Sequence, residues 1–145
     1  MTKTLQTQLD IESSEEKVWA ILTDFPAYPQ WNPFIKMISG EARAGATLDV
    51  HIQPPGQKGI TIHPKVLSAV PGRELRWLGH LLIPGIFDGE HHFLIQPTAA
   101  NKVSFVQEEL FKGVLVPFTN KMLAHTKQGF QQMNEALKRR AEAEG

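Results

Sequence analysis

The chain has 145 residues, a length that predicts one domain and leaves no room for a second sizeable core. Its 15 Lys and Arg residues balance its 15 Asp and Glu residues, so the basic surface that nucleic-acid binding needs is absent and we expect no nucleic-acid partner. The chain contains no cysteine, which excludes disulfides, thiolate nucleophiles and cysteine-bound zinc.

The amino-terminal segment predicts one strand followed by a short helix. Residues 3–11 alternate apolar and polar side chains, which is typical of a half-buried strand. Ser13 and Glu16 form a capping-box pattern at the start of a helix that should end before Pro26. The terminus carries no apolar leader, and no apolar run approaches the roughly 18 residues of a membrane span, so we expect a soluble, cytoplasmic protein.

Residues 24–34, DFPAYPQWNPF, combine three prolines with several aromatic rings. The prolines interrupt a long helix, while the rings are too apolar for a solvated loop. The segment therefore predicts a turn or short helical bend that covers part of the core, with Trp31 and Phe34 among its covering side chains.

The middle and the end of the chain differ in period. Residues 35–111 consist of short apolar runs separated by Pro and Gly clusters, which predicts an antiparallel meander. From about Val116 to Ala143 the pattern becomes helical, with Pro117 in the first turn. The apolar stripe of this long helix comprises Phe118, Met122, Thr126, Phe130, Met133 and Leu137. This order of elements predicts an α+β fold in which a twisted sheet grips one long helix and leaves a lined gap between them.

The chain resembles the SRPBCC superfamily, also described as START-like or Bet v 1-like, and within it the polyketide cyclase/dehydrase-like branch. The resemblance covers about Leu5 to Ala141 and is carried by LDIESSEEKVWAILTDFPAYPQWNPFI, PGRELRWLGHLLIPGIFDGEHHF, EELFKGVLVPF and GFQQMNEALK. It implies one ligand-binding domain over residues 1–145 with the helix-grip fold, a curved antiparallel sheet of about seven strands around the carboxyl-terminal helix. It also implies an internal cavity for an apolar ligand, but no invariant catalytic constellation.

The strand over residues 101–111 places its odd positions toward the helix, because those positions hold most of the apolar bulk. Glu109 then faces the cavity together with Phe105 and Gln107. A carboxylate in apolar surroundings must find a hydrogen-bond donor or hold a proton. In the other interpretation Glu109 lies near the strand end and reaches water or Lys112.

The run EHHFLIQ supplies the neighbouring strand, on which the family resemblance places His91 and Phe93 inward. Adjacent strand residues point to opposite faces, so His91 and His92 cannot bind one metal ion through their rings. We expect no metal and no cofactor. His91 is either a hydrogen-bonded wall residue or a proton-transfer group.

Trp77 is expected on the inner face, either as a flat wall for an aromatic ligand or as ordinary core. Phe87 is either a lid residue or a ring that packs back on the core. The predicted ligand-binding residues are Trp31, Phe34, Trp77, Phe87, His91, Phe93, Phe105, Gln107, Glu109, Phe118 and Met122.

Three functions remain open. The leading hypothesis is a monomer or homodimer that binds an apolar or aromatic small molecule, lipid- or polyketide-like, in the cavity. The alternative is a cyclase or dehydratase that uses Glu109 and His91, the candidate catalytic residues, to move a proton beside a carbonyl. An interaction module is disfavoured by the polar outer stripe of the long helix, and the sequence contains no nucleotide-binding or triad-hydrolase motif.

Overall fold

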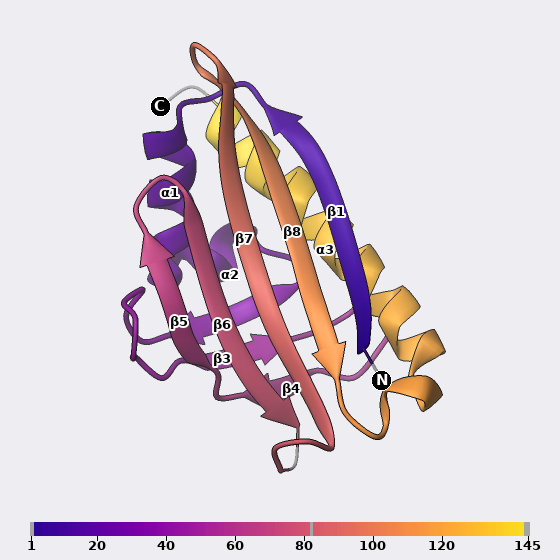
Figure 1. Ribbon diagram of the computed structural model, residues 1–145. Helices are drawn as coiled ribbons and strands as arrows, with labels where there is room; N and C mark the ends of the chain where they lie inside the picture. The colour runs from indigo at the N-terminus through magenta and orange to yellow at the C-terminus, as the bar shows by residue number, and fades with distance from the viewer. Residues whose placement is uncertain (1, 82, 144–145) are drawn as a thin grey trace.

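The computed structural model describes residues 2–81 and 83–143. In that part of the chain, eight strands form two antiparallel sheets, in the orders β1-β8-β7-β6-β5 and β2-β3-β4 (Figure 1). The strands are β1 Thr2–Ile11, β2 Ile35–Ser39, β3 Asp49–Ile52, β4 Ile60–Ile62, β5 Lys65–Val70, β6 Glu74–Leu81, β7 Phe87–Ala99 and β8 Lys102–Lys112. The helices are α1 Glu15–Thr23, α2 Tyr28–Trp31 and α3 Asn120–Glu142, with 3₁₀ turns at Phe25–Ala27 and Val116–Phe118.

The predicted α+β class and long terminal helix are confirmed, but the strand number is eight rather than about seven. The difference arises because residues 60–70, ITIHPKVLSAV, which form one apolar run in the sequence, contain two strands, β4 and β5. Pro64 interrupts the run, since proline has no N–H for a continuous ladder. The chain nevertheless stays paired there, because the Leu48 N–H donates to the Pro64 carbonyl at 2.9 Å and Thr47 bridges Lys65 between the two sheets.

Helix α1 begins one residue later than the capping box predicts. The Lys17 N–H donates to the Ser14 hydroxyl at 3.1 Å, so Ser14 is the N-cap and Ser13 is buried instead. The proline-rich segment forms a 3₁₀ turn and the single-turn helix α2, as the bend prediction requires. Tyr28 anchors this bend, because its buried hydroxyl donates to the Leu22 carbonyl at 2.5 Å.

The start of the terminal helix also differs from the prediction. Pro117 lies in a separate 3₁₀ turn, and α3 starts only at Asn120. Phe118 therefore falls outside the helical period and is 84% exposed, so it does not form the cavity wall predicted for it. The buried start of the stripe is Leu123, which packs with Phe87, Phe111 and Val116.

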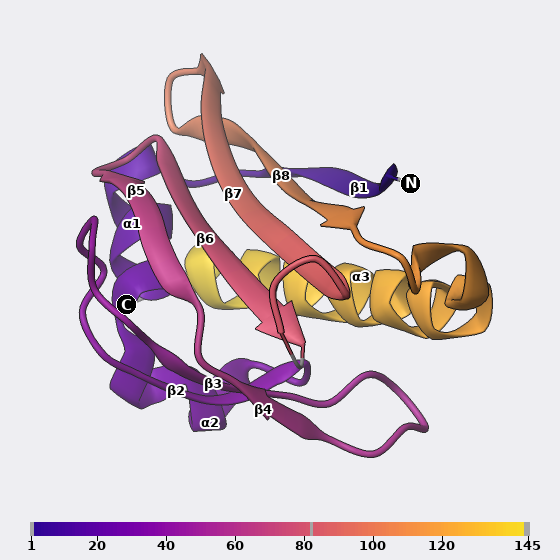
Figure 2. The ribbon, with the colours of Figure 1, turned by 60° about the horizontal axis from the view of Figure 1, so that its bottom comes forward.

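Helix α3 lies along the inner side of the five-stranded sheet, and the small sheet closes the opposite side (Figure 2). Its carboxyl-terminal half is buried through Phe130, Met133 and Leu137, which join the main core with α1 and both sheets. Close approach requires Gly129, because a Cβ there would overlap the Phe34 ring. In residues 2–81 and 83–143, every helix is too short or too polar to cross a lipid bilayer.

Candidate functional site

A pocket of about 390 Å³ lies between the small sheet, strands β6–β8 and the amino-terminal half of α3. Its volume is in the range of small-molecule sites. The lining is mostly apolar and comprises Phe34, Ile52, Pro54, Gln57, Lys58, Ile60, Ile62, Gly79, His80, Phe87, Gly89, Glu109, Phe111, Met122 and Thr126.

Two glycines account for the hollow on the inner face of the large sheet. The register pairs Gly79 of β6 with Gly89 of β7, so two neighbouring strands lack side chains at the same level. The carboxyl group of Glu109 occupies the space over Gly89, where an added Cβ would overlap its Oε2 atom. At Gly79 an added Cβ would meet Ile62 and Pro64 at 3.6 Å, an ordinary contact distance, so this position has room for a methyl group.

The structure brings four of the predicted ligand-binding residues to this pocket: Phe34, Phe87, Glu109 and Met122. Phe87 is a buried wall residue that stacks on Phe111, with ring centroids 5.3 Å apart, so it packs back on the core while lining the pocket. Glu109 points inward and contacts His91, in place of the alternative contact with Lys112.

The other predicted residues lie elsewhere. Trp77, Phe93 and Phe105 face inward but are buried in the solid part of the core, where the Trp77 and Phe93 rings are 5.2 Å apart. Trp31 lines a separate, smaller hollow beside α1. The alternation along a strand predicted which face is internal, but it carries no information on how deeply each end is filled.

Glu109 and His91 lie opposite each other in the β7–β8 ladder. Their side chains meet on the inner face, with Nδ1 of His91 3.0 Å from Oε1 of Glu109. His91 is buried, and the Glu109 side chain is 16% exposed. This pair joins the pocket wall to the core and contains the two groups that sequence analysis selected for proton transfer.

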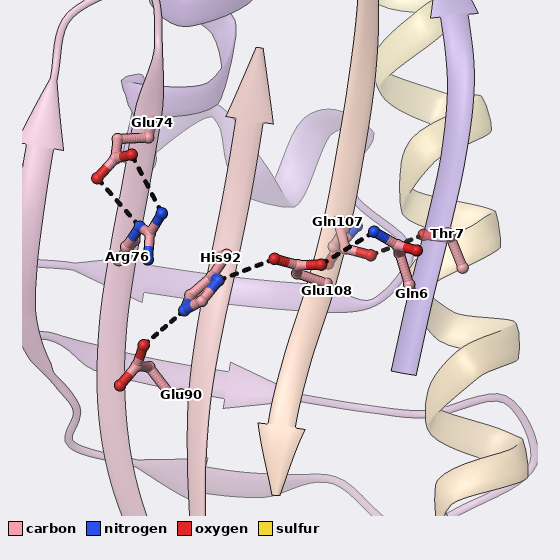
Figure 3. Close-up of polar contacts among 8 residues, drawn as sticks. All are labelled: Gln6, Thr7, Glu74, Arg76, Glu90, His92, Gln107 and Glu108. Carbon is pink, nitrogen blue, oxygen red and sulfur yellow. Dashed lines mark hydrogen bonds and ion pairs between the residues drawn. The ribbon is translucent and has the colours of Figure 1, made fainter. Parts of the chain in front are cut away.

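Behind His91, a chain of buried polar groups crosses the fold. His91 Nε2 lies 2.9 Å from Gln107 Oε1, and Gln107 Nε2 donates to Asn134 Oδ1 at 2.7 Å. Asn134 Nδ2 donates to Thr7 Oγ1 at 2.7 Å, and the Thr7 hydroxyl donates to the backbone carbonyl of Gln107 at 3.1 Å (Figure 3). Sequence analysis missed Thr7 and Asn134, because nothing local relates a strand residue to a helix residue 127 positions later.

His80, which also lines the pocket, forms a second pair with Asp88. Nδ1 of His80 lies 2.8 Å from Oδ1 of Asp88, and the Gly85 N–H donates to the same carboxylate at 3.0 Å. The hydrogen bond from His80 holds the pKa of Asp88 below its usual value. These contacts fix the turn before Phe87 and thereby that wall of the pocket.

His92 points to the opposite face of the sheet, as the sequence predicts. Its Nε2 lies 2.6 Å from Glu90 and its Nδ1 lies 3.0 Å from Glu108, which also accepts from Gln6 at 3.0 Å (Figure 3). Among the described residues, no three His, Asp or Glu side chains converge as metal ligands.

The fold is similar to that of several solved proteins of low sequence identity. A START superfamily protein from Mycobacterium smegmatis is 22% identical, with a TM-score of 0.74 over 96% of this chain and 97% of its own. The Zhui aromatase/cyclase from Streptomyces sp. R1128 is 14% identical, with a TM-score of 0.76 over 98% of this chain and 94% of its own. Truncated norcoclaurine synthase from Thalictrum flavum is 12% identical, with a TM-score of 0.76 over 100% and 96%.

Comparison with curated proteins gives no significant match. A family model described as polyketide cyclase / dehydrase and lipid transport matches residues 2–142, nearly the whole chain. The helix-grip arrangement of the sheets around α3 agrees with that match and with the structural neighbours. The chain therefore belongs to the polyketide cyclase / dehydrase and lipid transport family.

Proposed function

We propose that the protein binds a small, largely apolar molecule in the pocket between the small sheet and strands β6–β8. The observation that carries this proposal is a hollow of about 390 Å³ with an apolar lining in a chain of this family. Burying roughly 200–300 Å² of apolar ligand surface at about 25 cal/mol/Å² contributes about 5–7 kcal/mol before association costs. Apolar burial alone therefore supports reversible binding no tighter than about 10 μM.

The few polar groups in the pocket lining restrict the kind of molecule that the pocket can bind. Gln57, Lys58 and His80 lie in the lining together with Glu109, whereas the rest of the wall is hydrocarbon, glycine or a threonine. The ligand we propose therefore has an apolar body and few polar atoms, as lipid- and polyketide-like molecules do.

A pocket-filling variant tests the proposal. Gly79→Leu places a branched side chain at a glycine of the pocket lining. Thr61→Leu adds the same side chain at an exposed position of the neighbouring strand β4. We expect native mass spectrometry of protein purified from its own host to show a retained small molecule in the wild type and in Thr61→Leu. We expect that mass to be absent from Gly79→Leu.

Two results would contradict pocket binding. One is a folded Gly79→Leu protein that retains the same molecule to the same extent as the wild type. The other is a wild-type protein that carries no ligand and binds no apolar probe, such as 2-acetonaphthone, in solution. If Gly79→Leu does not fold, the smaller Gly79→Ala change followed by probe titration gives the same comparison.

The contact between Glu109 and His91 favours a second candidate function, a cyclase- or dehydratase-type enzyme. A carboxyl group paired with an imidazole at 3.0 Å can take a proton from a carbon beside a carbonyl and return it to an oxygen. The names of two structural neighbours, an aromatase/cyclase and norcoclaurine synthase, are those of enzymes on the same fold. Turnover of a polyketone-like substrate that is lost in Glu109→Gln would support this function.

A further inference from the structure

The buried polar chain behind His91 has a fixed direction, because it ends on backbone carbonyls that can only accept. The Gln107 carbonyl accepts from the Thr7 hydroxyl, so the Thr7 oxygen is left to accept from Asn134 Nδ2. Asn134 therefore presents its Oδ1 atom to Gln107, whose Nε2 atom donates to it. The hydrogen bond from Thr7 to the Gln107 carbonyl therefore sets the order of donors and acceptors along the chain.

A second carbonyl reinforces the same direction. The Phe130 carbonyl of α3 lies 3.5 Å from Gln107 Nε2, on the same side as Asn134. A reversed Gln107 amide would place its oxygen against this carbonyl, which is a repulsive contact between two acceptors. Gln107 is fully buried, so water cannot relieve that contact. The Gln107 oxygen must therefore face His91.

An acceptor at 2.9 Å requires a proton on the facing ring nitrogen, Nε2 of His91. From this we infer that Thr7, Gln107 and Asn134 are positioning residues that hold His91 as the Nε2-protonated imidazole. His91 Nδ1 and Glu109 then share a single proton at the wall of the pocket. This assignment rests on the direction of the chain and holds whether or not the protein is an enzyme.

The shared proton has two places. It lies on Glu109, which then donates to Nδ1 of a neutral imidazole, or it lies on Nδ1, which then donates to an ionised Glu109. The pair is electrically neutral as a whole in both arrangements. The remaining tautomer, with only Nδ1 protonated, would set the bare Nε2 lone pair against the Gln107 oxygen and lose a buried hydrogen bond.

The ligand class follows from that neutrality, a step that rests on the proposed function. Glu109 Oε2 lies over Gly89, where no side chain intervenes, so a ligand in the pocket can reach this oxygen. A carbonyl or hydroxyl oxygen can exchange a hydrogen bond with a group that holds one mobile proton. A ligand carboxylate would face a second acidic group, Glu109. A ligand ammonium would displace the shared proton and leave Nδ1 of His91 facing an ionised Glu109. We therefore expect an uncharged ligand end at Glu109.

Nuclear magnetic resonance of the ligand-free, full-length chain tests the tautomer. Long-range correlation of ring protons to ring nitrogens in ¹⁵N-histidine protein distinguishes protonated from bare nitrogens, and His91→Gln identifies the signals by their loss. We expect wild-type His91 to show a protonated Nε2. Gln107→Leu removes the acceptor, so we expect the form with only Nδ1 protonated to appear, whereas the same change at Gln96, an exposed glutamine of β7, should keep the wild-type pattern.

If Gln107→Leu does not fold, Gln107→Met gives the same readout, because it also removes the amide oxygen that faces Nε2. A bare Nε2 in the wild type would overturn the inference. So would an unchanged His91 pattern in a folded Gln107→Leu or Gln107→Met protein, since Gln107 would then have no influence on the tautomer.

Three naphthalene probes test the ligand class: 2-acetonaphthone, 2-naphthoate and 2-naphthylmethylamine. We expect the ketone to bind at least about tenfold more tightly than either charged probe, because each charge loses its hydration in the pocket, and to shift the His91 signals. Equal affinities without a His91 response would overturn the ligand class while leaving pocket binding intact. Failure of all three probes to bind would overturn the proposed function instead and leave the tautomer assignment standing.

Discussion

The two faces of strands β7 and β8 place the same residue types in different chemical settings. His91 and His92 are neighbours in sequence, are both buried, and each meets a glutamate of β8 at 3.0 Å. On the outer face the second partner of the ring is another carboxylate, Glu90, whose side chain is 35% exposed. On the inner face the second partner is the buried amide of Gln107.

The difference shows that the partners and their contact with water, more than the histidine itself, decide what the ring can do. Outside, the Glu90 side chain is 35% exposed and screened by solvent, and the cluster ties β7, β8 and β1 together as a structural link. Inside, one carboxyl group and one fixed amide leave a single shared proton next to an apolar pocket.

The largest expected effect comes from removing each ring. His91→Ala leaves a buried Gln107 oxygen and the Glu109 carboxyl without their partner and opens a cavity, so we expect a loss of about 3 kcal/mol in the free energy of unfolding. His92→Ala should cost about half as much, since the Glu90 side chain is 35% exposed and water can replace the ring as its partner. Urea denaturation of both variants measures the difference, and equal losses would contradict the contrast between the faces.

The next effect concerns the glycine beneath Glu109. Gly89→Ala forces the Glu109 carboxyl away from its place, because the added Cβ would overlap Oε2, and we expect a loss of about 1–3 kcal/mol. Gly79→Ala is the matched control, since its Cβ meets only ordinary contacts and should change stability by less than about 0.5 kcal/mol. Thermal unfolding of both variants gives the comparison, and a stable Gly89→Ala protein with an unchanged His91 signal would refute it.

A third prediction separates the role of the inner carboxyl in binding from its role in stability. In Glu109→Gln the amide can still donate to Nδ1 of His91, so we expect stability to change by less than about 1 kcal/mol. The mobile proton is lost, however, and turnover of any identified substrate should disappear. Glu108→Gln on the outer face should leave turnover unchanged. Unfolding of Glu109→Gln would instead identify Glu109 as a structural residue.

The smallest effect is the pH dependence of the outer face. The Ser68 hydroxyl donates to Glu74 at 2.7 Å. Together with Arg76, which contacts the same carboxylate (Figure 3), it holds the pKa of Glu74 below its usual value. A lowered folded-state pKa stabilises the protein above the unfolded pKa, and this stabilisation disappears as the pH falls through the folded value. Because Glu74 is partly exposed, we expect less than about 1 kcal/mol.

Urea midpoints measured between pH 7 and pH 3 in wild type and Ser68→Ala check that effect. The variant should lose stability at pH 7 and approach the wild type as the pH falls and Glu74 becomes protonated in both. Thr4→Val, which removes an exposed hydroxyl of β1, should leave the pH profile unchanged. A Ser68→Ala profile parallel to the wild type would remove Glu74 from the acid response.

The sequence by itself determined the order of elements, the amphipathic terminal helix and the opposite directions of His91 and His92. It also predicted that Glu109 turns inward. These features follow from side-chain periods of two in strands and 3.6 in helices, which are properties of a short stretch of chain. They carried no information on contacts between distant elements, so they did not show that Phe118 is exposed or that Trp31 lines a separate hollow beside α1.

Only the tertiary structure decided where the hollow lies and what stands behind His91. The pocket depends on the register that pairs Gly79 with Gly89, and the fixed proton on His91 depends on Thr7 and Asn134 meeting across the fold. Register, depth of packing and the direction of a hydrogen-bond chain are set by contacts between elements far apart in sequence. No local pattern of residues encodes them, because each depends on the side chain that the other element brings.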